Sequence, residues 1–187
     1  MLRWDEVNEY IHESEAELVD ELALCRDCPH KEPEGGGWMI AQIVHHLVRT
    51  EQIMYLVWLI APKLRDFPWI LRGLDRTNAL LWRLMGMREM ESAGGRPTPE
   101  NATKGKFSAP VFLRPGRASA NVGKYIEWRN HVRKRSLRAI VSLSEETLSN
   151  VKWSHPLFGP YTLMEFARFL AVHEQHHLPQ IRNIRQQ

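Results

Sequence analysis

The stretch that decides the fold is TLMEFARFLAVHEQHHLPQI, residues 162–181. Thr162, followed three residues later by Glu165, forms a capping box, which marks the start of a helix. Apolar side chains then recur at helical spacing, and two histidines four residues apart continue that apolar line. We therefore expect these histidines to lie about 6 Å apart at Cβ on one helix face, where they can share a cation. The side chains expected along this face are Phe166, Leu170, His173, His177 and Ile184.

Three further long stretches carry apolar residues at helical spacing, and none alternates convincingly with the period of two typical of a strand. Residues 92–118 lack a periodic apolar face and predict a long loop, and a polar loop is expected over residues 155–160. Four long amphipathic helices predict an all-α fold, a four-helix bundle with a long loop between the second and third main helices. Besides the final helix, the expected helices are Trp4 to Leu24, Trp38 to Ala61, a shorter one from Trp69 to Met85, and Ala120 to Leu143.

The chain of 187 residues is long enough to bury a core, and we expect a single domain over residues 1–187. Its longest apolar run, residues 53–62, is about half the length of a membrane span and predicts a buried helix segment instead. The N-terminal sequence MLRWDE lacks the apolar stretch of a signal peptide. These features predict a cytoplasmic protein with no membrane partner.

Charge is distributed unevenly along the chain. Residues 1–34 contain eleven acidic and three basic residues, whereas residues 103–138 contain ten Lys and Arg and one acid. The basic residues are scattered around an expected helix, without the glycine-rich or aromatic-interleaved pattern of a nucleic-acid site. We expect either a solvated face or one that attracts an acidic helix of the same bundle, and no nucleic-acid partner. The residues concerned are Arg129, Arg133, Lys134, Arg135 and Arg138.

Cys25 and Cys28 form a C-x-x-C motif at the expected end of the first helix. Such a motif is a redox site when it opens a helix after a strand, and half of a zinc site when a second pair exists. The sequence offers neither context, so we interpret the pair as cytosolic thiols without a joint function.

A third histidine from another helix would complete a three-nitrogen metal site with an open position for water or substrate. His45 and His46 are adjacent and point about 100° apart, so only one of them can face such a site. Helical spacing from Thr50 favours His46, and on the final helix His176 is expected to face solvent or another helix. The expected inward stripe of the second helix is Ile43, His46, Thr50, Ile53 and Val57.

Several other residues are candidates for roles around that site. His155 is a candidate general base, although a loop residue that shapes the turn is the plainer interpretation. Glu51, Glu165 and Glu174 are candidates to orient the second ring nitrogen of a metal ligand, with Glu165 already explained as a cap. Trp38 is interpreted as a packing residue at a helix start.

Three segments together carry a resemblance to a known family. They are WMIAQIVHHL at 38–47, HPLFGPYT at 155–162 and HEQHHLPQI at 173–181, with KFSAP at 106–110 as a less specific match. In this order they resemble the DinB/YfiT-like superfamily of metal-dependent four-helix-bundle proteins. Carried over residue by residue, the metal-binding histidines of the family fall on His46, His173 and His177. Pro179 departs from the pattern, since proline inside a helix removes a backbone donor.

The resemblance implies a divalent metal ion, zinc or nickel, and reactions that use a low-molecular-weight thiol such as bacillithiol, mycothiol or glutathione. It also implies a homodimer formed by helix packing. We expect a metal-dependent enzyme, S-transferase-like or hydrolase-like, acting on a small electrophile through an activated thiol or water. Lys104, Lys106 and Arg114 are candidates to attract the carboxylates of a thiol cofactor. The alternative is a non-catalytic, stress-related bundle that binds a metal or ligand; no protein residue is assigned as catalytic.

Overall fold

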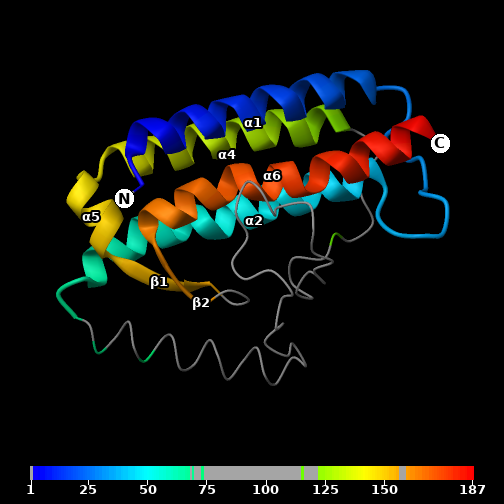
Figure 1. Cartoon of the computed structure of the whole chain (residues 1–187). Helices are drawn as coiled ribbons and strands as arrows, with labels where there is room; N and C mark the ends of the chain where they lie inside the picture. Colours follow the sequence, from blue (N-terminus) through cyan, green and yellow to red (C-terminus); the bar gives the residue numbers. More distant parts are fainter. Residues whose placement is uncertain (1, 68, 70–72, 74–114, 116–121, 156–158) are drawn as a thin grey trace.

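The computed structural model describes residues 2–67, 69, 73, 115, 122–155 and 159–187. Four long helices lie side by side and form the bundle that the sequence predicts (Figure 1). Close contacts join α1 to α6, α2 to α4 and α2 to α6. The all-α prediction is therefore confirmed. The long helices are α1 (Trp4–Leu24), α2 (Ile40–Ile60), α4 (Val122–Val141) and α6 (Leu163–Gln186).

The capping box of α6 forms as the sequence predicts. The Thr162 hydroxyl accepts from the Glu165 backbone N–H at 3.1 Å, and the Glu165 carboxylate accepts from the Thr162 N–H at 2.7 Å. These reciprocal bonds satisfy two donors that a helix start would otherwise leave unpaired. The helix then continues through Pro179 to Gln186, so the proline does not end it.

No stretch of the sequence alternates convincingly like a strand, yet the bundle carries one short hairpin. Strands β1 (Lys152–His155) and β2 (Gly159–Thr162) pair antiparallel, with Trp153 opposite Tyr161. Each strand has four residues, too short for alternation to stand out in the sequence. Tyr161 is buried against the bundle core, and this packing stabilises a hairpin that would be marginal in isolation. Of the polar loop expected over residues 155–160, His155, Gly159 and Pro160 lie in the two strands, and residues 156–158 lie outside the described residues.

Two smaller elements complete the described fold. The 3-10 helix η1 (Ala61–Leu64) follows α2, and α5 (Glu145–Asn150) precedes the hairpin, with the Ser144 hydroxyl accepting from the Thr147 N–H at 3.2 Å. Apart from Trp69, Gly73 and Pro115, the helix expected over 69–85 and the loop expected over 92–118 lie outside the described residues. None of the helices in the described part has the length and apolar character to cross a membrane.

Two predictions about helix faces need correction. Ile53, expected on the inward stripe of α2, is 41% exposed, and the buried face continues through Met54 instead. The sequence alone does not show which of these residues faces the core, because α2 is apolar on nearly every side around Ile53. A solvated face is wrong for Arg129 and Arg133, which are 1% and 2% exposed. The alternative, attraction to an acidic helix, is correct for Arg129, which pairs with Glu15 of α1, whereas Arg133 pairs with single glutamates of α2 and α6.

The C-x-x-C pair lies where α1 ends. Cys25 is the buried C-cap residue, Cys28 is half-buried, and both thiols are free. Burial, together with Cys28 and Glu21 nearby, raises the pKa of Cys25 to about 11. The thiol is therefore protonated at neutral pH and a weak nucleophile. The interpretation of the pair as thiols without a joint function stays a prediction.

Candidate metal centre

Three histidine rings from two helices converge at one point between α2 and α6. The Nε2 atom of His173 lies 3.0 Å from Nε2 of His46 and 3.2 Å from Nε2 of His177. One ligand nitrogen from each ring lies within 4.8 Å of the other two. In a tetrahedral zinc site with Zn–N bonds of about 2.0–2.1 Å, the ligand nitrogens are about 3.3 Å apart. The spacing of the three rings therefore fits a single divalent ion.

The protonation states of these rings also suit a metal. His46 and His177 are only 4% and 5% exposed. Burial and the neighbouring His177 and His46 lower the pKa of His173 well below its usual 6.5. Burial, with His46 and His176, lowers the pKa of His177 to about 3. One proton can bridge only one of the two close nitrogen pairs, whereas a cation would engage one ring nitrogen from each of the three histidines.

Gln180 fixes the tautomer of one ligand ring. Nδ1 of His177 lies 3.0 Å from Oε1 of Gln180, and because a carboxamide oxygen only accepts, Nδ1 is the donor. Nε2 of His177 therefore presents its lone pair to the cluster. We expected Glu51, Glu165 or Glu174 in this role. Glu51 and Glu174 instead pair with arginines, and Glu165 caps α6, so that expectation is corrected.

The Gln180 contact leads to a testable prediction. A Gln180→Leu variant should bind zinc about 10- to 100-fold more weakly, because the His177 ring loses the acceptor that fixes its tautomer and orientation. The measurement is a competition titration with a chromophoric chelator. Gln175→Leu is the matched control, since Gln175 lies on the same helix and donates to Glu17 at 3.4 Å instead. Equal affinities in the two variants would contradict the role of Gln180.

Aromatic rings hold the three histidines from the side. Trp38, which precedes the first residue of α2, stacks on His177 at 6.4 Å and lies 5.0 Å from the ring of His46. Phe169 stacks on His173 at 5.5 Å with an angle of 12° between the ring planes. Trp38 therefore packs as the sequence predicts, and it contacts two of the three candidate ligands.

The neighbouring histidines point elsewhere. The ring of His45 stacks at 5.1 Å on Tyr125 of α4, so His46 is the member of this pair that joins the cluster. The His176 ring lies edge-on to His177, 5.1 Å away, and its nitrogens are not part of the group of three. Of the adjacent histidines, those whose nitrogens lie close together are therefore His46, His173 and His177.

His155 lies in β1 and packs among aromatic rings. Its ring is 4.9 Å from Phe169, 5.7 Å from Tyr161 and 5.9 Å from Phe166. Burial lowers the pKa of His155 to about 3. A general base works best with a pKa near the working pH, so these surroundings favour a packing role over that of a base.

A pH dependence of stability follows from His155. The folded protein keeps this ring neutral down to about pH 3, whereas in the unfolded chain it binds a proton below its ordinary pKa of 6.5. Between these values the unfolded state holds the extra proton, so metal-free protein should lose stability as the pH falls below 6.5. The contribution of one such histidine is at most about 1.4 kcal/mol per pH unit.

The check is urea unfolding of metal-free protein between about pH 7 and about pH 5, compared with His155→Gln. As the pH falls, the unfolding free energy of the variant should decrease less steeply than that of the unsubstituted protein, by up to about 1.4 kcal/mol per pH unit. Parallel slopes in the two proteins would rule this contribution out.

Comparison with known proteins places the whole site within one matched region. Residues 11–181 match the family model described as the DinB superfamily. The chain is 23% identical over 176 residues to the uncharacterized protein YuaE of Bacillus subtilis (strain 168), and the match covers 94% of each chain. No solved structure matches the chain. The three histidines and Gln180 all fall inside the matched residues.

Proposed function

Because this chain belongs to the DinB superfamily, we propose that it is an enzyme whose His46, His173 and His177 hold a divalent metal ion, zinc or nickel. The observation that carries the proposal is the convergence of three histidine ring nitrogens on one point. The substrate would be a small electrophile, attacked by a low-molecular-weight thiol or by water. Thiol transfer is the first candidate reaction and hydrolysis the second.

A site with three imidazole ligands is suited to catalysis. Three imidazoles carry no charge, so a bound ion keeps its full double charge and at least one open coordination position. When bound, such an ion lowers the pKa of a coordinated thiol or water. The protein supplies the orientation: Gln180 sets the tautomer of His177, and Trp38 and Phe169 limit the rotation of the rings.

The proposal includes partners that follow from the family resemblance. We include a thiol such as bacillithiol, mycothiol or glutathione, a small-molecule substrate and a second copy of the chain. Lys104, Lys106 and Arg114, the candidates to attract thiol carboxylates, lie outside the described residues. A cytoplasmic location and the absence of nucleic-acid partners stay predictions.

The test begins with protein purified without a histidine tag. Elemental analysis should find about one zinc or nickel ion per chain. The loaded protein is then incubated with each thiol and a chromogenic electrophile, and with ester and amide substrates without thiol. We expect metal-dependent turnover with at least one thiol, which chelation abolishes.

One outcome would contradict the proposed catalysis, and another would contradict metal binding itself. Equimolar metal without turnover for any thiol, ester or amide would favour the non-catalytic metal-binding bundle. In that case chelation should lower the melting temperature markedly, as for a structural site. Failure to bind any divalent metal would overturn the site itself.

A further inference from the structure

A layer of buried charge crosses the middle of the bundle. One apolar cluster contains Ile11, Met54, Ile140 and Leu170, and another contains Leu18, Val44 and Ile181. On each long helix at least one buried polar residue lies between these two clusters: Ser14, Glu51, Arg129, Arg133 and Glu174 are in this position. We call this set the central polar layer: Ser14 and Glu15 of α1, Glu51 of α2, Arg129 and Arg133 of α4, and Glu174 of α6.

Arg133 makes the contacts that join the two metal-site helices. Its Nε donates to Oε1 of Glu51 at 2.7 Å, and its Nη2 donates to Oε2 of Glu51 at 3.1 Å. The same Nη2 donates to Oε1 of Glu174 at 2.8 Å. One buried guanidinium on α4 therefore ties a carboxylate of α2 to a carboxylate of α6.

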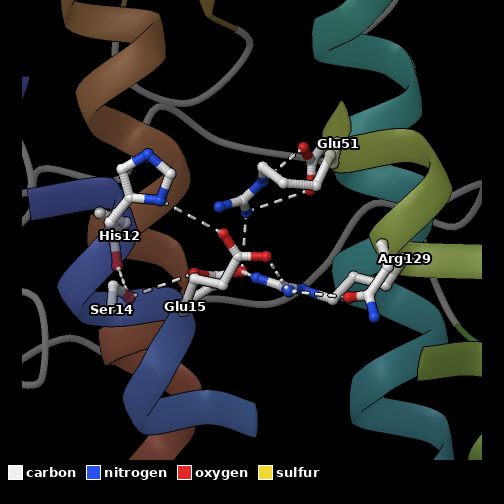
Figure 2. Close-up of polar contacts among 9 residues, drawn as sticks. His12, Ser14, Glu15, Glu51 and Arg129 are labelled. Carbon is white, nitrogen blue, oxygen red and sulfur yellow. Dashed lines mark hydrogen bonds and ion pairs between the residues drawn. The ribbon is translucent and has the colours of Figure 1, made fainter. Parts of the chain in front are cut away.

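Arg129 makes a different set of connections. Its Nη1 donates to Glu15 of α1 at 2.9 Å, and its Nη2 donates to Glu174 of α6. The Ser14 hydroxyl donates to the other oxygen of Glu174 at 3.2 Å. Figure 2 shows Ser14 and Glu15 reaching in from one side, with Glu51 and Arg129 opposite them. Of the two arginines, Arg133 is the one that links α2 with α6.

We propose that Arg133 is a positioning residue for the metal centre, holding α2 and α6 in the rotation that brings His46 to His173 and His177. This inference rests on the proposed metal-binding function. Residue 174 directly follows the ligand at 173, so fixing one side chain fixes the direction of the other, about 100° away around the helix. Glu51 is five residues after His46, about 140° around α2, and is fixed by the same guanidinium.

The ion pairs of Arg133 also restrict the relative rotation of the two helices. A bidentate guanidinium–carboxylate pair has a fixed planar geometry, which a point charge does not impose. Arg133 and the two carboxylates are almost fully buried. A rotation of either helix that broke these contacts would leave buried charges unpaired, which is costly. The layer therefore opposes rotations that would separate the histidines.

The experiment compares two charge-balanced pairs of substitutions. Glu51→Met with Arg133→Met removes the link between α2 and α6 and takes away one charge of each sign. Glu21→Met with Arg185→Met is the matched control, because Arg185 donates to buried Glu21 at 2.6 Å and joins α1, not α2, to α6. Cobalt(II) serves as the probe, since it accepts the same nitrogen donors and has visible absorption bands.

We expect the Glu51/Arg133 variant to bind cobalt about tenfold more weakly or worse, with altered absorption bands and unchanged helical circular dichroism. The control pair should keep both the affinity and the spectrum of the unsubstituted protein. A merely structural role would lower the melting temperature of both variants without changing the cobalt spectrum.

A more conservative substitution tests the same role in case the double variant does not fold. Arg133→Lys keeps the charge but cannot hold both carboxylates with a planar fork, so it should also weaken cobalt binding and alter the spectrum. Unchanged affinity and bands in Arg133→Lys, or in the folded double variant, would overturn the positioning role while leaving the metal site intact. If the unsubstituted protein does not bind cobalt, the proposed function fails and this inference with it.

Discussion

A His173→Ala variant should lose stoichiometric binding of zinc or nickel. His173 is the central member of the cluster, since its Nε2 is the atom that lies 3.0 Å from one candidate ligand and 3.2 Å from the other. Its removal leaves two donors, and we expect affinity to fall by more than the 10- to 100-fold typical of losing an outer contact, about 100-fold at least. Elemental analysis after dialysis and a chelator competition titration measure this loss.

The control for this variant is the histidine three residues along the helix. His176→Ala removes an imidazole from the same helix, but its nitrogens lie outside the group of three, so binding should be retained. The same contrast applies on α2, where His46→Ala should abolish binding and His45→Ala should not. Retention of one tightly bound ion per chain in His173→Ala would contradict the proposed site.

Stability provides a second readout of the same variant. A ligand that binds only the folded state stabilises it by about 4 kcal/mol when its concentration is 1,000 times the dissociation constant. Zinc should therefore raise the melting temperature of the unsubstituted protein and of His176→Ala. Zinc should not raise the melting temperature of His173→Ala. The comparison separates loss of the site from loss of the fold, because both are measured on the same samples.

The close approach of His173 and His177 was predictable because its signal is local. His173 and His177 lie four residues apart on a helix whose start is marked by Thr162 and Glu165, and a helix with a known start and apolar face fixes where they point. The same spacing argument predicts a contact between His177 and Gln180, since residues three apart on a helix are neighbours. We expected a glutamate to orient the ligand ring, and the amide of Gln180 was therefore missed.

The central polar layer was not predictable in the same way. Arg129 and Arg133 stand in a basic helix that resembles a solvated one, and their partners are distant in sequence. Glu15 precedes Arg129 by 114 residues, and Glu51 precedes Arg133 by 82. Which of several basic residues turns inward depends on how α4 packs against the other helices. Periodicity alone does not specify that packing.

The hairpin illustrates another limit of local signals. Four-residue strands carry little periodicity, and β1 and β2 depend on contacts of Trp153 and Tyr161 with the bundle core. Their effect on the site is indirect. The hairpin places His155 beside Phe169, which in turn stacks on His173. A short element missed in the sequence therefore contacts the candidate metal centre indirectly, through Phe169.

The largest loss of stability is expected from Glu174→Gln in metal-free protein. Glu174 is fully enclosed and accepts from Arg129, Arg133 and Ser14. Burial alone would raise the pKa of this carboxyl, but Arg133 and Arg129 together lower it, so the group is ionised at neutral pH. Glutamine keeps the shape and removes the charge, leaving two buried guanidinium groups short of one carboxylate. Breaking a buried ion pair in this way costs about 3–5 kcal/mol.

Urea unfolding at neutral pH measures this loss, and its pH dependence identifies the cause. A carboxyl whose pKa is lowered by folding contributes stability above its unfolded value of 4.5, and this contribution disappears as the pH falls through the lower folded value. The gap between the unsubstituted protein and Glu174→Gln should therefore be widest at neutral pH and close on acidification. Asp5→Asn is the control, since its pair with Arg3 is mostly exposed and should add nothing measurable. A gap below about 1 kcal/mol at neutral pH would mean that the charge of Glu174 does not stabilise the central polar layer.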